Sequence, residues 1–519
     1  MWYKILALLC CFIIMLNLTS CYPVSLLSPE PKECERKLFR AIESDIQEMA
    51  KEALEEGADI NRFHSKRLRE RLWHNESDSN PLLMSMFCGS SAITNILLDS
   101  GADVNHVNDA GRSILSYCAE FKRELIPTVM NLGADINYID RHGRTAIDYF
   151  LDRYNLLSST SFQAFLQYRP TIHSSTLERI IDDMQKKPEE LKNYKILKLL
   201  YENYENISCP SEIEYAFNGK NELLKEKIIL GDYNSDYDAI IISAVAAFGS
   251  SETLDYLYQN DIGKQSVSPE HLFRLASMFG NAENMSYLVE SEANIDDRES
   301  SKGYSAFELA ALNNQTDALK ILVDFGADLT HSTMELDEDA LCYAIRHKNS
   351  EMFEFLLEYV EYFNLGHAVF TAIRENNNEA LTVLLQMGVD PNYGCYATNL
   401  LGLAVGEKNT EAIEILLKYN ADINADVAFS PLLRAIDYGY ADMVLLLIEN
   451  GADVNKKGMS DERIPVSAAI LSGQLEILKI LVDNGAQIKN VSYYDGTLLE
   501  LAENRGSENV YKYVKSLFE

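Results

Sequence analysis

A five-residue phrase, Gly-Ala-Asp followed by an aliphatic residue and usually Asn, returns along this chain of 519 residues and constrains its fold more than any other feature. Close copies begin at six positions: Gly57, Gly101, Gly133, Gly326, Asn420 and Gly451. The spacing is nearly constant, with 32 residues from Gly101 to Gly133 and 31 from Asn420 to Gly451. Weaker copies begin at Glu292, Gly388 and Gly485, and the period predicts a further turn near Val360. A unit of about thirty residues therefore repeats through the chain.

Each copy of the phrase has the residues that end a helix. Glycine adopts the left-handed conformation that closes a helix, and the Asp or Asn after it caps the next turn with its side chain. Between copies, apolar residues recur at helical spacing, as in Ile413, Leu416 and Leu417. Only a neighbouring repeat can cover such a stripe, so the pattern predicts a stack of helix pairs.

The phrase and its spacing resemble the ankyrin repeat, in which a helix opening with T-P-L-H-x-A is followed by a second helix and a Gly-Ala-Asp turn. The segment from Ser305 to Ala310 stands where the first helix opens, and the segment from Asp317 to Val323 stands where the second helix falls. No copy keeps the histidine of T-P-L-H, which in the family links neighbouring repeats; Glu308, Leu433 and Ser467 occupy its place. The resemblance implies an all-α ankyrin solenoid of about fourteen helix-turn-helix repeats, several of them degenerate.

We expect five folded or tethering parts after a leader at residues 1–20: a tether at 21–37, N-terminal repeats at 38–139, degenerate repeats at 140–290, regular repeats at 291–496 and capping helices at 497–519. In the degenerate part, apolar helices are predicted to end near Tyr168, Asn203, Gly231 and Asn260. The alternative for this part is a separate all-helical domain.

The first residues have the layout of a signal peptide, with Lys4 followed by a weakly polar to apolar run from Ile5 to Leu18. The run is shorter than the roughly 20 residues of a membrane-spanning helix. Leu18-Thr19-Ser20-Cys21 matches the lipobox of bacterial lipoproteins, which implies that Cys21 is lipidated and becomes the mature N-terminus. Tyr22 favours the outer membrane, facing the periplasm, by resemblance to the enterobacterial sorting rule. The alternatives are an ordinary secretory signal cut elsewhere and an uncleaved signal anchor.

Charge excludes one class of partner and favours another. Asp and Glu outnumber Lys and Arg by 79 to 46, which gives a net charge of -33. Such a chain repels nucleic acid and attracts a basic protein. The exception is a basic insertion at residues 62–80, which makes its repeat about a dozen residues longer than the period. The insertion contains five cationic side chains: Arg62, Lys66, Arg67, Arg69 and Arg71. This insertion is interpreted as a contact with anionic lipid, as a partner contact, or as a loop that pairs with acidic neighbours.

The sequence contains no phosphate loop, nucleophile elbow, H-E-x-x-H or paired C-x-x-C motif, so we expect no enzyme, no cofactor and no metal. His64, His74 and His142 are expected to be solvated loop residues. Of the scattered cysteines, Cys88, Cys118 and Cys342 fall on apolar helix faces and are predicted to lie in the core. Ankyrin arrays bind partners with turn tips and inner helices, which implies a partner-binding set at two tips: His106, Asn108, Asp109, Tyr138, Asp140, Arg141 and His142.

These features predict a monomeric, lipid-anchored scaffold of the bacterial cell envelope that binds an unidentified, basic protein. Ankyrin lipoproteins act as periplasmic immunity factors in some toxin-secreting bacteria, and the resemblance extends that role to this chain. Two alternatives stay open: an enzyme whose site is hidden in residues 140–290, and a secreted eukaryotic or parasite protein with Asn75 and Asn206 as glycan acceptors.

Overall fold

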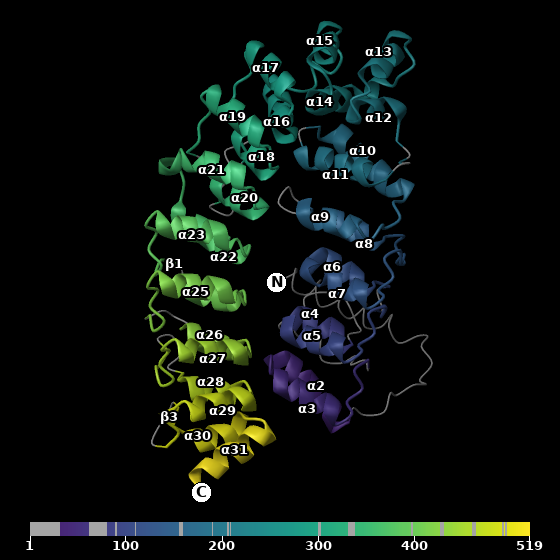
Figure 1. Ribbon diagram of the computed structural model, residues 1–519. Helices are drawn as coiled ribbons and strands as arrows, with labels where there is room; N and C mark the ends of the chain where they lie inside the picture. The colour runs from purple at the N-terminus through teal and green to yellow at the C-terminus, as the bar shows by residue number, and fades with distance from the viewer. Residues whose placement is uncertain are drawn as a thin grey trace, which may run out of the picture.

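The computed structural model shows a stack of short helix pairs that runs out along one arm and returns along another (Figure 1). It describes residues 32–61, 80–88, 91–108, 111–154, 159–188, 190–204, 207, 209–298, 303–330, 338–395, 398–425, 430–458, 463–489, 492–493 and 496–519. Within these ranges, helices α2 to α31 form fifteen successive pairs. The all-α ankyrin solenoid is confirmed, with the expected repeats followed by a terminal pair.

The first arm, called here the N-terminal arm, holds four helix pairs. Its first helices lie next to one another, so α2 packs on α4 and α6 packs on α8. Its elements are α2 (Glu33–Ser44), α3 (Gln47–Glu55), α4 (Pro81–Cys88), α5 (Ser91–Asp99), α6 (Ile114–Phe121), the 3-10 turn η2 (Arg123–Leu125), α7 (Ile126–Asn131), α8 (Ala146–Asp152) and α9 (Ser159–Leu166).

The second arm, the C-terminal arm, holds ten pairs whose first helices pack in one unbroken row from α12 to α30. Its helices are α12 (Ser211–Phe217), α13 (Asn221–Ile229), η4 (Ser235–Tyr237), α14 (Asp238–Phe248), α15 (Ser251–Gln259), α16 (Pro269–Phe279), α17 (Ala282–Glu290), α18 (Ala306–Leu312), α19 (Thr316–Asp324), α20 (Ala340–His347), α21 (Ser350–Leu357), η5 (Val360–Tyr362), α22 (Leu365–Arg374), α23 (Asn378–Gln386), α24 (Leu400–Gly406), α25 (Thr410–Lys418), α26 (Pro431–Asp437), α27 (Ala441–Glu449), α28 (Pro465–Leu471), α29 (Leu475–Asp483), α30 (Leu498–Arg505) and α31 (Glu508–Phe518).

Two small hairpins stand at repeat tips of the C-terminal arm. β1 (Gly394–Cys395) pairs antiparallel with β2 (Thr398–Asn399), and β3 (Ser492–Tyr493) pairs antiparallel with β4 (Gly496–Thr497). In the first hairpin Gly394 lies opposite Asn399, and in the second Ser492 lies opposite Thr497. Each hairpin leads directly into the first helix of the next pair.

The pair α10 (Ser174–Lys186) and α11 (Leu191–Asn203) joins the two arms, and we call it the joint. Besides packing on each other, α10 contacts α14 and α11 contacts α9. The ammonium of Lys198 on α11 lies 4.8 Å from the ring centroid of Phe248, and that of Lys195 lies 5.6 Å from the ring of Phe279. The joint therefore touches both arms, and Figure 1 shows the stack reversing its direction just beyond it, at α12 to α17.

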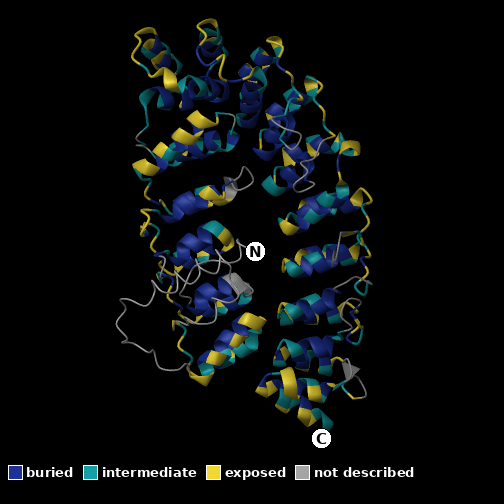
Figure 2. Cartoon of the chain, turned by 180° about the vertical axis from the view of Figure 1, so that it is seen from behind, coloured by how far each residue is buried: buried dark blue, intermediate teal, exposed yellow. Residues whose placement is uncertain are grey.

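The core follows the helices as a continuous band in both arms (Figure 2). Cys118 and Cys342 are fully buried, as predicted, while the side chain of Cys88 lies outside the described residues. The predicted glycine turns are also confirmed, because Gly57, Gly101 and Gly133 have φ angles of 84°, 87° and 90°. Helices α9, α11, α13 and α15 end within two residues of their four predicted ends.

Candidate partner-binding surface

The repeat tips are tied to one another by their own Asp and Asn side chains. At the second tip, the Asp103 carboxylate accepts a hydrogen bond from the backbone amide of Asn105 at 2.9 Å. The Asn105 side chain then accepts a bond from the backbone amide of Asp135, one repeat later, at 2.7 Å, and donates to the Gly133 carbonyl at 2.9 Å. The same link to the next repeat is made by Asn61, Asn137, Asp296, Asn392, Asn424 and Asn455. Each tip is thus held by its neighbour.

Two of the predicted binding residues, Asn108 and Asp140, are buried and organise their own tips. The side-chain nitrogen of Asn108 donates to the Tyr117 hydroxyl at 2.8 Å, and its side-chain oxygen accepts from the backbone amide of Arg112 at 2.9 Å. One repeat later, Asp140 accepts from the Tyr149 hydroxyl at 2.5 Å and from the backbone amide of Arg144 at 2.9 Å. Both side chains are at most 6% exposed, so their polar atoms stabilise the tip conformation.

In the hydrogen-bonded pair of Asp140 and Tyr149, only Asp140 is charged at neutral pH. Burial alone would raise the pKa of Asp140, but hydrogen bonds from the Tyr149 hydroxyl and from the Arg144 and His142 amides outweigh it and lower the pKa. Burial, followed by the bond to Asp140, raises the pKa of Tyr149 to about 12. Tyr149 therefore stays a hydrogen-bond donor and Asp140 an ionised acceptor at neutral pH.

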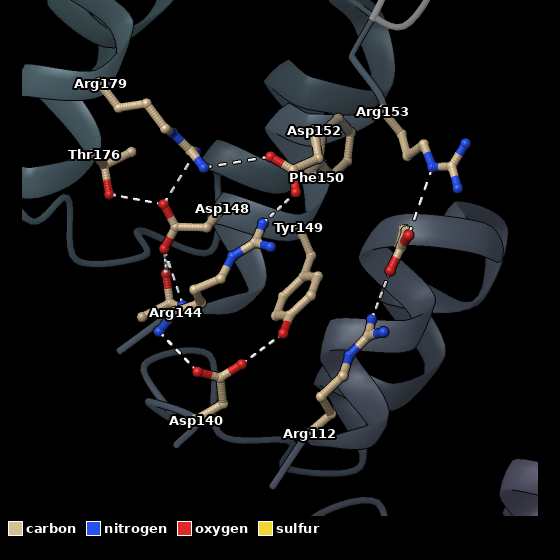
Figure 3. A network of polar contacts seen from close by, with 12 residues as sticks. Arg112, Asp140, Arg144, Asp148, Tyr149, Phe150, Asp152, Arg153, Thr176 and Arg179 are labelled. Atoms are coloured by element: carbon tan, nitrogen blue, oxygen red, sulfur yellow. Dashed lines mark hydrogen bonds and ion pairs between the residues drawn. The ribbon is translucent and has the colours of Figure 1, made fainter. Parts of the chain in front are cut away.

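Arginine side chains stack on the tyrosines of two successive repeats, and Figure 3 shows Arg112 and Arg144 beside Tyr149. The Arg112 guanidinium lies 4.1 Å from the ring centroid of Tyr117 and 4.0 Å from that of Tyr149, and it pairs with Glu120 at 2.7 Å. Arg144 covers the other side of Tyr149 at 4.1 Å. Cation–π contacts and ion pairs of this kind fix planar side chains firmly.

The same network continues to the joint through Asp148, which is 6% exposed. Its carboxylate accepts from the Thr145 amide at 2.9 Å, which caps α8, and from the Thr176 hydroxyl of α10 at 2.9 Å. Arg179 of α10 pairs with Asp148 at 3.2 Å and with Asp152 at 3.3 Å (Figure 3). Three consecutive first helices, α6, α8 and α10, are thereby joined by one polar network.

Asp148 also stands where the family places the histidine of T-P-L-H. In the C-terminal arm, Glu308 and Ser467 hold that place and cap their own helices, accepting from the Ser305 amide at 2.8 Å and the Ile464 amide at 3.0 Å, and Glu308 also pairs with Arg298 at 3.8 Å. At Asp148, the carboxylate that stands in the place of the histidine does reach the next repeat.

The remaining predicted residues differ in exposure. Arg141 and His142 are exposed, whereas Tyr138 and His106 are half-buried. Ile139, which the sequence reasoning did not select, lies between them and is 50% exposed. The stem of Arg141 covers Gly111 of the preceding tip, where an added Cβ would meet its Cγ at 2.7 Å. The two tips therefore form one surface.

Several predicted residues lie outside the described residues: Asp109, the lipidation candidate Cys21, and the basic insertion with its flanking His64 and His74. Among the residues that the structure describes, no group of three or more His, Cys, Asp or Glu side chains is arranged to hold a metal ion. No helix in that part of the chain has the length and apolarity needed to span a membrane.

Comparisons with known proteins identify the repeats. The family model of ankyrin repeats matches residues 241–333 and 369–458, both in the C-terminal arm. The chain is 25% identical to an ankyrin repeat protein of Acanthamoeba polyphaga mimivirus over 260 residues, which are 47% of this chain and 34% of that protein. It is 26% identical over 200 residues to the human transient receptor potential cation channel subfamily A member 1, covering 36% of this chain and 15% of the channel.

The matched region therefore spans about a third or less of each relative's own length. The two segments matched by the family model lie in the C-terminal arm, whose first helices stack without a break. The same helix pairs and glycine turns continue through the N-terminal arm. The chain therefore contains ankyrin repeats and is similar over part of its length to ankyrin-repeat proteins.

Proposed function

We propose that the chain is a protein-binding scaffold and that the two adjoining tips of the N-terminal arm are its contact surface. One observation carries this proposal: the exposed side chains of Ile139, Arg141 and His142 stand on tips whose backbone is fixed by Asn105, Asp140 and the arginine stack. A rigid surface loses little conformational entropy on binding. Ankyrin-repeat relatives are typically non-catalytic scaffolds, and no catalytic step is assigned here.

A basic protein fits as the partner, because the chain carries a net charge of -33 and would attract a cation from a distance. The tips then supply the short-range contacts. Exposed Arg141 lies in a segment of balanced charge and selects for a carboxylate on the partner's contact face. The partner would thus be basic overall with an acidic residue at the contact.

The location of this scaffold is part of the proposal. The lipobox ending in Cys21 supports a lipid anchor in the bacterial envelope, at the outer membrane facing the periplasm, where the scaffold would protect against a basic toxin. The relatives come from a giant virus and from human, so they support the repeats and leave the compartment open. Mass spectrometry of the mature N-terminus tests the anchor: acyl mass on Cys21 is expected, and a free amino terminus would overturn it.

The contact surface is tested by changing only exposed atoms. The variant Arg141→Ala/His142→Ala should lose at least tenfold in affinity for the co-purified partner, measured by calorimetry, with an unchanged melting temperature. The matched control, Gln487→Ala/Lys489→Ala, removes exposed side chains from a tip of the C-terminal arm and should bind normally. Equal losses in both variants would contradict the assignment to the N-terminal arm.

A further inference from the structure

The first repeat touches the last repeats, although nearly the whole chain separates them. The side-chain amide of Gln47 donates to the Tyr438 carbonyl at 3.4 Å. The side-chain amide of Asn509 donates to the Glu52 carboxylate, also at 3.4 Å. Both views place α2 and α3 beside the last helices of the C-terminal arm (Figures 1 and 2). The two ends of the array are therefore in contact.

The contact is made by the turn between α2 and α3, which lies over successive turns of the C-terminal arm. An added Cβ at Gly439 would lie 3.2 Å from the side-chain oxygen of Gln47. An added Cβ at Gly473 would lie 3.4 Å from a methyl group of Ile46 and 3.5 Å from the Cβ of Glu48. The absence of side chains at these two positions allows the first repeat to approach.

The residue at this turn position differs between the repeats of the C-terminal arm. Earlier in the C-terminal arm, the left-handed position of the turn is held by Asn314, Lys348, Asn376 and Lys408, with φ angles from 50° to 61°. At the two turns beneath the first repeat it is held by glycine, with φ of 73° at Gly439 and 70° at Gly473. Glycine also holds it at Gly219 and Gly280, where an added Cβ would meet Phe248 and Gln315 of the same arm. Because Asn and Lys satisfy the same backbone, conformation alone does not require glycine there.

Charge opposes the contact even though local pairs support it. Residues 32–61 carry nine acidic and five basic side chains, and residues 430–519 carry thirteen acidic and nine basic ones. The pKa of Glu508 is lowered mainly by a hydrogen bond from Lys512. The positive charge of Lys37, on the other side of the contact, lowers it further. The net repulsion between two acidic ends is long-ranged, and salt screens it.

We propose that the turn between α2 and α3 acts as a clasp that closes the ankyrin array into a loop, and that ionic strength controls whether the clasp is shut. A few hydrogen bonds and glycine-permitted contacts hold the closed form, while like charge favours the open form. Screening of that charge, by salt or by a bound cationic protein, closes the loop.

An engineered disulfide measures closure directly. In the variant Glu48→Cys/Gly473→Cys the two Cβ atoms would stand 3.5 Å apart, within the range of natural disulfides. The matched control, Gly473→Cys/Ser507→Cys, has a separation of 3.8 Å and lies within the C-terminal arm alone. Both variants carry the same strained cysteine at position 473. On mild oxidation of dilute protein, both are expected to form an intramolecular crosslink, identified by peptide mass spectrometry. A crosslink in the control without one between positions 48 and 473 would overturn the clasp.

The salt dependence of the same crosslink tests the control of the clasp. Between about 0.02 M and about 0.5 M sodium chloride, the rate for Glu48→Cys/Gly473→Cys should rise several-fold relative to the control, since the Debye length shrinks. A relative rate that is unchanged or falls with salt would overturn the electrostatic part.

A second variant opens the clasp without cysteines. Gly439→Asn/Gly473→Asn keeps the left-handed turns, as Asn314 and Asn376 do, but places side chains against Gln47 and Ile46. Small-angle X-ray scattering should show a larger radius of gyration with little change in melting temperature, whereas Asn376→Gly should leave the radius unchanged. An unchanged radius in the double variant would mean that these turns do not carry the contact.

Discussion

The two arms share one kind of turn but join their repeats differently. In the N-terminal arm, α6, α8 and α10 are linked by arginine stacks and by the buried carboxylates of Asp140 and Asp148. In the C-terminal arm, apolar first helices pack in an unbroken row, and residues such as Ser467 cap only their own helix. Asn and Asp side chains link successive tips in both arms, and the N-terminal arm adds arginine stacks and buried carboxylates to these links.

Local charge separates the arms as well. Residues 108–179 hold eight acidic and eight basic side chains, whereas residues 291–519 hold 37 acidic and 17 basic ones. The family model matches only the arm with regular apolar stacking. The charge-balanced segment at residues 108–179 holds the network of arginine stacks and buried carboxylates, and it is where we place the binding surface.

The largest expected difference between the arms is in the cost of removing the side chain at the histidine position of the T-P-L-H motif, which Asp148 holds in one arm and Ser467 in the other. Asp148→Ala removes a buried carboxylate that bonds Thr145, Thr176 and Arg179, and should lower the free energy of unfolding by about 2–4 kcal/mol. Ser467→Ala removes only a helix cap and should cost about 1 kcal/mol. Urea unfolding followed by circular dichroism measures both, and equal costs would break the comparison.

The second prediction concerns the joint, where acid should separate the arms first. His271 of α16 is 3% exposed, and its ring lies 6.2 Å from that of Tyr194 on α11. Burial, with a smaller effect of Arg274, lowers its pKa from 6.5 to about 3. The unfolded chain binds a proton here before the folded chain does, so stability is full above pH 6.5 and falls as pH drops toward 3.

The loss from this one group should reach a few kcal/mol, on the order expected for a shift of this size. Hydrogen-exchange protection, measured relative to the intrinsic rate at each pH, should fall in α11 and α16 below pH 6.5 before it falls elsewhere in the C-terminal arm. In His271→Leu this part of the pH dependence should disappear. If the variant unfolds with the same pH dependence as the natural chain, another group controls the joint.

The smallest expected effect tests what the arms share. Gly133 and Gly451 have φ angles of 90° and 96°, and an added Cβ at either would meet nothing within 4 Å. Gly133→Ala and Gly451→Ala should therefore each cost about 1 kcal/mol, through backbone strain alone. Glu292→Gly, at a φ of 66°, should instead gain a similar amount. Thermal unfolding measures all three, and unequal costs for the two alanine variants would show that the turns differ too.

The sequence predicted the repeat and its turns because both are local. The helix ends, the left-handed glycines and the tip caps each depend on residues a few positions apart. It did not predict that Asn108 and Asp140 would be buried, since their partners Tyr117 and Tyr149 lie nine residues away on a helix. The parallel recurrence of Asn108 with Tyr117 and of Asp140 with Tyr149, one repeat apart, was a readable signal. The course of α10 and α11 depends on long-range packing that no local pattern records.

The contact between the first and last repeats changes how such an array is expected to unfold. A linear stack frays from its two terminal repeats, each of which has only one neighbour. Here the turn at Gln47 gives the first repeat a second neighbour at Tyr438, so neither terminus is a free end in the closed state. Unfolding of the closed chain should then begin at an interior weak point such as the joint, where α10 packs on α14 and α11 packs on α9.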